Sequence, residues 1–81
     1  MFENCESTVV EIIEKALRLD AGIVKESSSS ENIDSWDSLG QLSILVAMDK
    51  YFDGRISNVP EMAEANSVSK ILNILKENSI C

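Results

Sequence analysis

The residues with the clearest chemical potential form a short polar turn, Asp37-Ser38-Leu39-Gly40, directly ahead of an amphipathic stretch. Ser38 stands where a helix would begin, and a hydroxyl there can accept a hydrogen bond from an unpaired backbone N–H group. The same hydroxyl can also carry a covalent group once a base activates it. Capping is the common use of such a serine, so the turn alone does not decide between a structural and a functional Ser38.

The chain offers little other machinery for catalysis. It contains no histidine, which is the commonest general base and a frequent metal ligand. Its two cysteines, Cys5 and Cys81, lie near opposite ends without the spacing of zinc ligands. We therefore expect neither an enzyme nor a metal site. We also expect reduced cysteines, with a disulfide between them the less favoured alternative, because nothing marks the chain as secreted.

Length and charge narrow the class of protein further. The 81 residues suffice for a single small domain, residues 1–81, without room for an active-site cleft of ordinary size. The formal net charge of −7 disfavours nucleic-acid binding and favours partners with basic patches. No apolar run approaches the length of a membrane span, and no secretion signal is visible. We expect a monomer of the cytoplasm without stable membrane insertion.

Apolar residues recur at helical spacing, and no strand pattern competes with it. A loose leader, residues 1–6, precedes a first helix over residues 8–18, in which Thr8 and Glu11 fit a capping box. The residues expected on its inward face are Val9, Ile12, Ile13, Ala16 and Leu17. Those expected on its outward face are Glu11, Glu14, Lys15 and Arg18.

A long connection over residues 19–37 follows, and loops of this length in small domains are often functional. It contains four consecutive serines, residues 27–30, which are typical of a flexible segment. We expect Ile23, Val24 and Ile33 to attach the loop to the core. Trp36 either packs over the helices or stands partly exposed beside Ser38, and packing is favoured because large aromatic side chains are mostly buried.

The second helix is expected to run from Ser38 to about Phe52, with Gly54 as its stop. Its expected inward stripe is Leu42, Leu45, Met48 and Phe52. Pro60 suits the first turn of a short segment near residues 60–65, and Ser67 caps a last helix. The apolar face of that last helix is Val68, Ile71, Leu72 and Leu75. The fold class is therefore all-α, a small four-helix bundle of three longer helices plus one short one.

This layout resembles the acyl carrier protein family from the first helix to Leu75, most densely between Ile33 and Ile56. The motif that carries the resemblance is Asp34-Ser35-Trp36-Asp37-Ser38-Leu39-Gly40, supported by the long polar loop, the short third segment and the acidic composition. In that family a phosphopantetheinyl transferase moves 4′-phosphopantetheine from coenzyme A onto the serine. The resemblance implies that Ser38 carries this arm, that Asp37 helps the transferase recognise the turn, and that Leu39 touches partner enzymes. A phosphodiester at Ser38 would lie at a helix N-terminus, where N–H groups and the helix dipole favour an anion.

The resemblance also implies a partner surface on the second helix, formed by Leu39, Gly40, Ser43, Val46 and Asp49. Family members of fatty-acid biosynthesis usually carry a row of carboxylates there, whereas this chain has Asp49 next to Lys50. We interpret the difference as a sign of a specialised carrier, which works with a dedicated acyl ligase, acyltransferase or synthase. Neutral change on a solvated helix face is the alternative explanation.

A second function from another class stays open at this stage. The chain could be a small acidic helical adaptor that binds partner proteins without covalent modification, with Ser38 as a plain cap. The sequence does not identify the acyl group that a carrier would hold.

Overall fold

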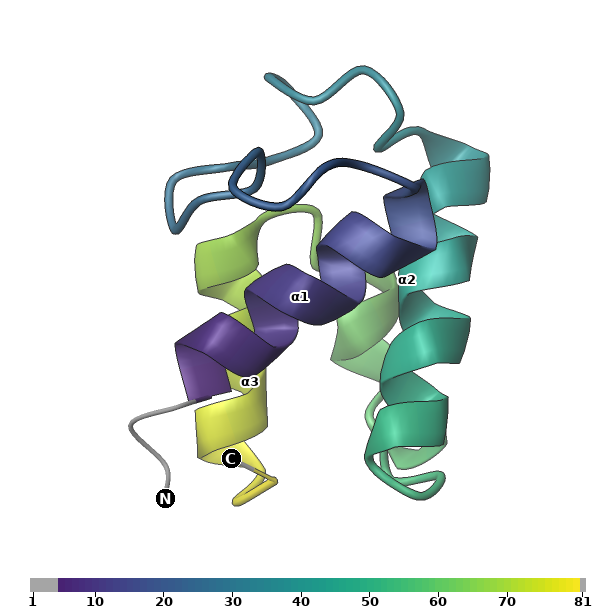
Figure 1. The fold of residues 1–81 in the computed structure, drawn as a ribbon. Coiled ribbons are helices and arrows are strands. Elements are labelled where there is room, and N and C mark those ends of the chain that lie inside the picture. The colour runs from purple at the N-terminus through teal and green to yellow at the C-terminus, as the bar shows by residue number, and fades with distance from the viewer. Residues whose placement is uncertain (1–4, 81) are drawn as a thin grey trace.

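The computed structural model describes residues 5–80 and contains, within them, three α-helices and two short 3-10 helices. The α-helices are α1 (Cys5–Leu17), α2 (Ser38–Tyr51) and α3 (Val68–Glu77), and the 3-10 helices are η2 (Ile56–Asn58) and η3 (Pro60–Glu64). In Figure 1, α1 crosses obliquely in front of the upright α2 and α3. Helix α1 contacts both of them, and η3 contacts both from its own side of the molecule.

The all-α fold is confirmed, but the fourth helix is not. Residues 60–64 form a 3-10 helix with Pro60 in its first turn, so the expected short segment exists with a tighter winding. The five residues lie between two caps outside the helical conformation, Val59 and Ala65, and 3-10 helices are characteristically this short. Residues 5–80 thus contain three α-helices, with a long loop between α1 and α2 and the two 3-10 helices between α2 and α3.

Helix α1 begins one turn earlier than its capping pattern predicts. It starts at Cys5, so Thr8 lies inside the helix and does not cap it. Cys5 and Val9 are both buried in the core, and this contact extends the helix beyond the expected start. Of the expected leader, residues 1–4 lie outside the described residues. Cys5 is disulfide-bonded, contrary to the expectation of reduced cysteines, and Cys81, the other cysteine of the sequence, lies outside the described residues.

The carboxylate of Glu14 lies inside the protein, although its sequence position predicted the solvent face. Glu14 is only 7% exposed, and its Oε2 accepts hydrogen bonds from the N–H groups of Gly22 (2.9 Å) and Val24 (3.2 Å). These bonds offset the cost of burying a carboxylate. They also fix the start of the long loop, where Val24 is buried as expected while Ile23 is exposed.

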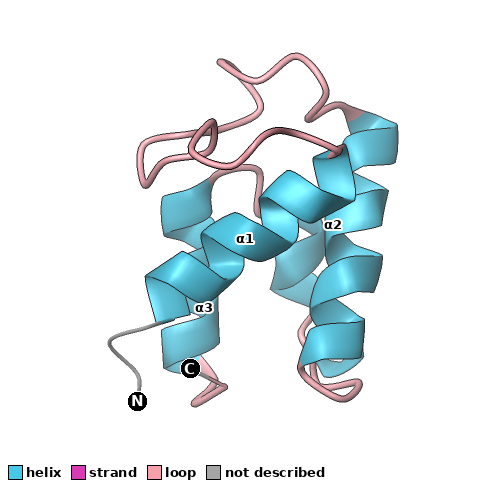
Figure 2. Ribbon diagram, viewed as in Figure 1, coloured by secondary structure: helices cyan, strands magenta, loops and turns pink. Residues whose placement is uncertain are grey.

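The serine run in the loop is attached to α3, so it does not behave as a free linker. Ser28 is buried, and its carbonyl oxygen accepts the N–H group of Val68 at 3.0 Å. The N–H group of Ser30 donates to the carbonyl oxygen of Asn66 at 2.9 Å. Together with the buried Ile33, these bonds hold the loop across one end of the helices (Figure 2).

Helix α2 is rotated relative to the prediction: Met48 is buried as expected, but Leu42 is not. Its buried residues are Gly40, Ile44 and Met48, whereas Leu42 is 56% exposed. Leu45 and Phe52 are only partly buried. The spacing of the buried residues is four, which places them on one line along the helix.

Gly40 is what allows this line to pack closely. A Cβ atom at position 40 would collide with the carbonyl oxygen of Ser35 and would approach Leu17 Cδ2 to 2.9 Å. The N-terminal turn of α2 therefore lies directly against the end of α1 and the preceding loop. Gly40 is consequently part of the core and not of the predicted partner surface.

The remaining elements match their sequence signals. Ser67 caps α3, because its side chain accepts a hydrogen bond from the N–H group of Lys70, and the whole predicted apolar face of that helix is buried. Helix α2 ends where Gly54 donates its N–H group to the carbonyl oxygen of Asp49, with positive φ at Asp53 and Gly54. Within residues 5–80, no helix combines the length and apolarity needed to cross a membrane.

Candidate functional site

At the start of α2, Asp37 caps the helix and Ser38 is exposed. Asp37 is the N-cap, since its Oδ1 accepts the N–H group of Gly40 at 2.9 Å and its carbonyl oxygen accepts that of Gln41 at 2.7 Å. Ser38 is the first residue of the helix and is exposed. The capping role that the sequence left open for Ser38 therefore belongs to Asp37, and the Ser38 hydroxyl faces solvent without that task.

The backbone around Ser38 favours an anion. Within the described residues, the N–H groups of Ser38 and Leu39 have no hydrogen-bond partner, as expected for the first turn of a helix. These groups and the positive end of the helix dipole lie directly beside the hydroxyl oxygen. A negatively charged group attached to Ser38 would meet donors already in place.

Three apolar side chains continue from Ser38 along the solvent side of α2. Leu39 is 76% exposed, Leu42 is 56% exposed and Val46 is 52% exposed. Ser43 lies beside them and is exposed as well. We call Leu39, Leu42 and Val46 the apolar stripe. Leu39, Ser43 and Val46 are thus exposed as predicted, and Leu42 is the member that sequence analysis assigned to the core.

Asp49, the remaining residue of the predicted partner surface, makes a structural hydrogen bond. Its Oδ1 accepts the N–H group of Ser57 at 3.0 Å and so ties α2 to the start of η2. The carboxylate still contributes negative charge to the end of α2, where the exposed Lys50 lies beside it. The structure therefore brings together Ser38 and the apolar stripe, with Asp49 further along the helix and Gly40 excluded.

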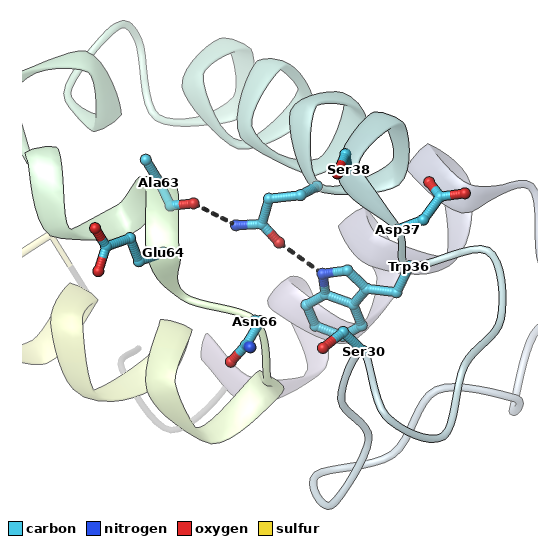
Figure 3. Close-up of a pocket in the computed structure, with 8 residues that line it drawn as sticks. Ser30, Trp36, Asp37, Ser38, Ala63, Glu64 and Asn66 are labelled. Atoms are coloured by element: carbon cyan, nitrogen blue, oxygen red, sulfur yellow. Dashed lines mark hydrogen bonds between the residues drawn. The ribbon is translucent and has the colours of Figure 1, made fainter.

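A pocket of about 610 Å³ opens beside Ser38 (Figure 3). One wall comes from the long loop and the start of α2, with Ser30, Trp36, Asp37 and Ser38. The opposite wall comes from η3 and the turn after it, with Ala63, Glu64 and Asn66. Because most of these side chains can donate or accept hydrogen bonds, we call this space the polar pocket.

Trp36 and Gln41 form the floor of the polar pocket. The indole Nε1–H of Trp36 donates to Gln41 Oε1 at 2.6 Å, and Trp36 is only 2% exposed, which confirms the packed alternative. Gln41 Nε2 in turn donates to the carbonyl oxygens of Met62 (3.3 Å), Ala63 (3.3 Å) and Ala65 (3.1 Å). Figure 3 shows the resulting connection from Trp36 to Ala63. It holds the loop, α2 and η3 together.

Sequence analysis did not single out Gln41. The available signal was a long amide side chain three residues after Ser38, at the start of an otherwise apolar helix. Its three carbonyl partners lie more than twenty residues away in the chain, so nothing local in the sequence points to them.

A second, apolar groove follows the polar pocket along α2. It measures about 510 Å³ and lies between α2 and the 3-10 segments. The apolar residues that line it are Leu45, Val46, Ile56, Val59, Pro60, Met62 and Ala63. Ala63 lines both spaces, so the polar pocket and the apolar groove meet at this residue.

No group of three or more potential metal-ligating side chains occurs among residues 5–80. Comparison with protein-family models, with curated proteins and with solved structures gave no match for this chain.

Proposed function

We propose that this protein is an acyl carrier protein that holds acyl intermediates as thioesters on a 4′-phosphopantetheine arm attached to Ser38. The observation that carries the proposal is the position of Ser38, an exposed hydroxyl at the first residue of α2 whose capping role is taken by Asp37. This arrangement agrees with the motif resemblance around Asp37-Ser38-Leu39.

The attachment reaction needs chemistry that the partner enzyme must supply. Ser38 Oγ would attack the phosphorus next to the pantetheine half of coenzyme A, and the nucleotide half would leave with the electrons of the broken P–O bond. The chain has no histidine to take the serine proton, and Asp37 accepts a backbone N–H group, so the base belongs to the transferase. The phosphodiester product would lie near the N–H groups of Ser38 and Leu39, which stabilise its charge.

The exposed stripe supports a docking role for α2 in the same proposal. A partner enzyme that reaches the arm at Ser38 would also reach Leu39, Leu42 and Val46, which are exposed on the same helix. Apolar contacts rather than a row of carboxylates would then hold the partner. This arrangement favours a specialised carrier with a dedicated acyl ligase, acyltransferase or synthase.

Intact-mass measurement tests the proposal directly. The protein is incubated with coenzyme A and a phosphopantetheinyl transferase of broad specificity, and we expect its mass to rise by one phosphopantetheine group. Ser38→Ala should show no increase, whereas Ser43→Ala, an exposed serine on the same helix, should be modified like the wild type. An unchanged wild-type mass would favour the adaptor alternative. Modification of Ser38→Ala would move the attachment to another serine.

The fold of the Ser38→Ala variant needs to be checked in the same experiment. Because Asp37 and not Ser38 forms the cap, we expect the free energy of unfolding to change by less than about 0.5 kcal/mol, as for ordinary surface substitutions. Circular dichroism and urea denaturation measure this. A loss of helix content would mean that the absence of modification reflects unfolding instead of a missing hydroxyl.

A further inference from the structure

The two spaces beside α2 differ in chemistry and are arranged in sequence along the helix. The polar pocket adjoins Ser38, and the apolar groove begins further along, at Leu45. A flexible group attached to Ser38 would meet the polar pocket first. A hydrocarbon carried at the end of that group would gain burial only by continuing into the apolar groove.

Gln41 stands at the boundary between these spaces. Its side chain crosses from α2 to η3 and donates to the carbonyl oxygens of Met62, Ala63 and Ala65. Met62 and Ala63 also line the apolar groove. Gln41 Oε1 is engaged by the Trp36 indole, so both ends of the amide are held in place. A hydrocarbon chain that passed this point would have to displace a hydrogen-bonded amide. The carbonyl oxygens of Ala63 and Ala65 would lose this donor, whereas that of Met62 would keep the N–H group of Ala65.

From this arrangement we propose that Gln41 is a specificity-determining residue, which confines the arm to the polar pocket and bars a long hydrocarbon from the apolar groove. The inference rests on the proposed attachment at Ser38 and deepens it by naming the cargo class. The carrier suits short or polar acyl groups rather than long saturated chains.

The polar pocket has the groups that such an arm requires. A pantetheine chain contains two amides, each with one donor and one acceptor. The side chains of Ser30 and Asn66 can both donate and accept, and the exposed carboxylate of Glu64 can accept an amide N–H group. A hydroxyl or amino group on a short acyl chain would find the same partners. A long alkyl chain would find less apolar contact there than in the apolar groove, because only Trp36 and Ala63 offer it an apolar surface.

The test compares acyl groups of different chemistry on the same protein. Ser38 is loaded enzymatically with pantetheine analogues that end in an acetyl, 3-hydroxybutyryl or octanoyl amide, which resist hydrolysis. The melting temperature of each form is measured for the wild type, for Gln41→Ala and for Asn73→Ala. Asn73→Ala is the control, since it also replaces a side-chain amide by alanine, at an exposed position of α3 that lines neither space.

In the wild type we expect the octanoyl form to melt within about 1 °C of the acetyl form, because the alkyl chain stays outside the groove. In Gln41→Ala the octanoyl form should melt about 4 °C or more above the acetyl form of the same variant, as expected when several methylene groups become buried in a domain of this size. Asn73→Ala should behave like the wild type in this difference, because its side chain lines neither space. A purely structural role of Gln41 would lower all forms equally.

Amide NMR shifts locate the arm independently of stability. On loading with unacylated pantetheine, the largest shifts should include Ser30, Glu64 and Asn66, with smaller changes at Val59 and Leu45 in the apolar groove. Failure of the loading step would overturn both this inference and the proposed function. Successful loading with equal octanoyl stabilisation in the wild type and Gln41→Ala would overturn this inference alone, as would arm shifts centred on the groove.

Discussion

At the scale of single residues, Asp37 caps α2 and Ser38 offers a free hydroxyl, so capping and the proposed attachment belong to different residues. An N-cap side chain folds back toward the first turn to accept an N–H group, and Asp37 does this through its Oδ1. The next residue, Ser38, is thereby left with an exposed hydroxyl. A carboxylate cap also places negative charge next to Ser38. If Ser38 is the attachment point, as proposed, a basic surface of the modifying enzyme can recognise this charge.

Substitutions of Asp37 can distinguish capping from recognition. Asp37→Ala should lower the free energy of unfolding by about 0.5–2 kcal/mol, because the Gly40 N–H group loses its partner. Asp37→Asn keeps a good capping group without the charge, so its stability should stay within a few tenths of a kcal/mol of the wild type. We nevertheless expect Asp37→Asn to be modified more slowly, as measured by the mass increase over time. Modification at the wild-type rate would leave Asp37 with the capping role alone.

Gly40 provides a second prediction for a single residue. Glycine to alanine normally stabilises a helix interior by about 1 kcal/mol. At position 40 the added Cβ would meet the Ser35 carbonyl oxygen and Leu17 Cδ2, so we expect Gly40→Ala to destabilise the protein by about 1–3 kcal/mol. Urea denaturation gives the sign directly. A stabilised Gly40→Ala variant would mean that the loop before α2 packs less closely than described.

At the scale of elements, α2 and α3 show why one helix could be oriented from its sequence and the other could not. The apolar residues of α3 lie on one face, so its buried side is unambiguous. Helix α2 carries apolar residues on nearly every side, from Leu39 through Met48. Its buried line is selected by Gly40, where the absence of a Cβ atom allows close contact with Ser35 and Leu17. Periodicity alone does not contain that information.

The orientation of α2 predicts unequal effects for two similar substitutions. Ile44→Ala should cost about 2–5 kcal/mol, because Ile44 is fully buried and its loss leaves a cavity. Leu42→Ala removes a side chain from the exposed apolar stripe and should cost less than about 0.5 kcal/mol. Chemical denaturation of both variants tests the orientation. Equal losses, or a larger loss for Leu42→Ala, would contradict it.

The same reasoning separates what the sequence could predict from what it could not. The all-α fold, the Ser67 cap and the burial of Trp36 follow from local spacing and residue type. The burial of Glu14 and the attachment of the serine run depend on backbone groups brought near by the fold. The site divides in the same way. The exposure of Ser38, Leu39 and Val46 could be predicted from the sequence. The role of Gln41 could not, because it depends on hydrogen bonds to Met62 and Ala63 of η3, which are distant in the chain.

At the scale of the whole molecule, the negative net charge is not concentrated beside Ser38, where the exposed apolar stripe lies. The net charge of −7 favours encounter with basic partners from a distance. The side of α2 next to Ser38 instead offers the apolar stripe and ends at Asp49 and Lys50. Long-range attraction and close contact are therefore supplied by different parts of the surface. A partner that requires a row of carboxylates on α2 would be attracted but held weakly.

The absence of a row of carboxylates on α2 leads to a prediction about enzymes of general fatty-acid synthesis. We expect the loaded wild type to be a poor substrate for a generic malonyl transferase or chain-elongating synthase. Ser43→Glu combined with Lys50→Glu should raise kcat/KM and make it fall more steeply with salt, because both positions are exposed on α2. Gly40 is unsuitable for such a substitution because it is buried against Ser35.

A matched control places the same charge change elsewhere. Asn73→Glu combined with Lys76→Glu alters two exposed positions of α3 and should leave kcat/KM close to that of the wild type. If both double variants improve activity equally, total charge and not the surface of α2 governs recognition. If the wild type already matches a housekeeping carrier and neither variant improves it, the protein belongs to ordinary fatty-acid synthesis and the specialised role is wrong.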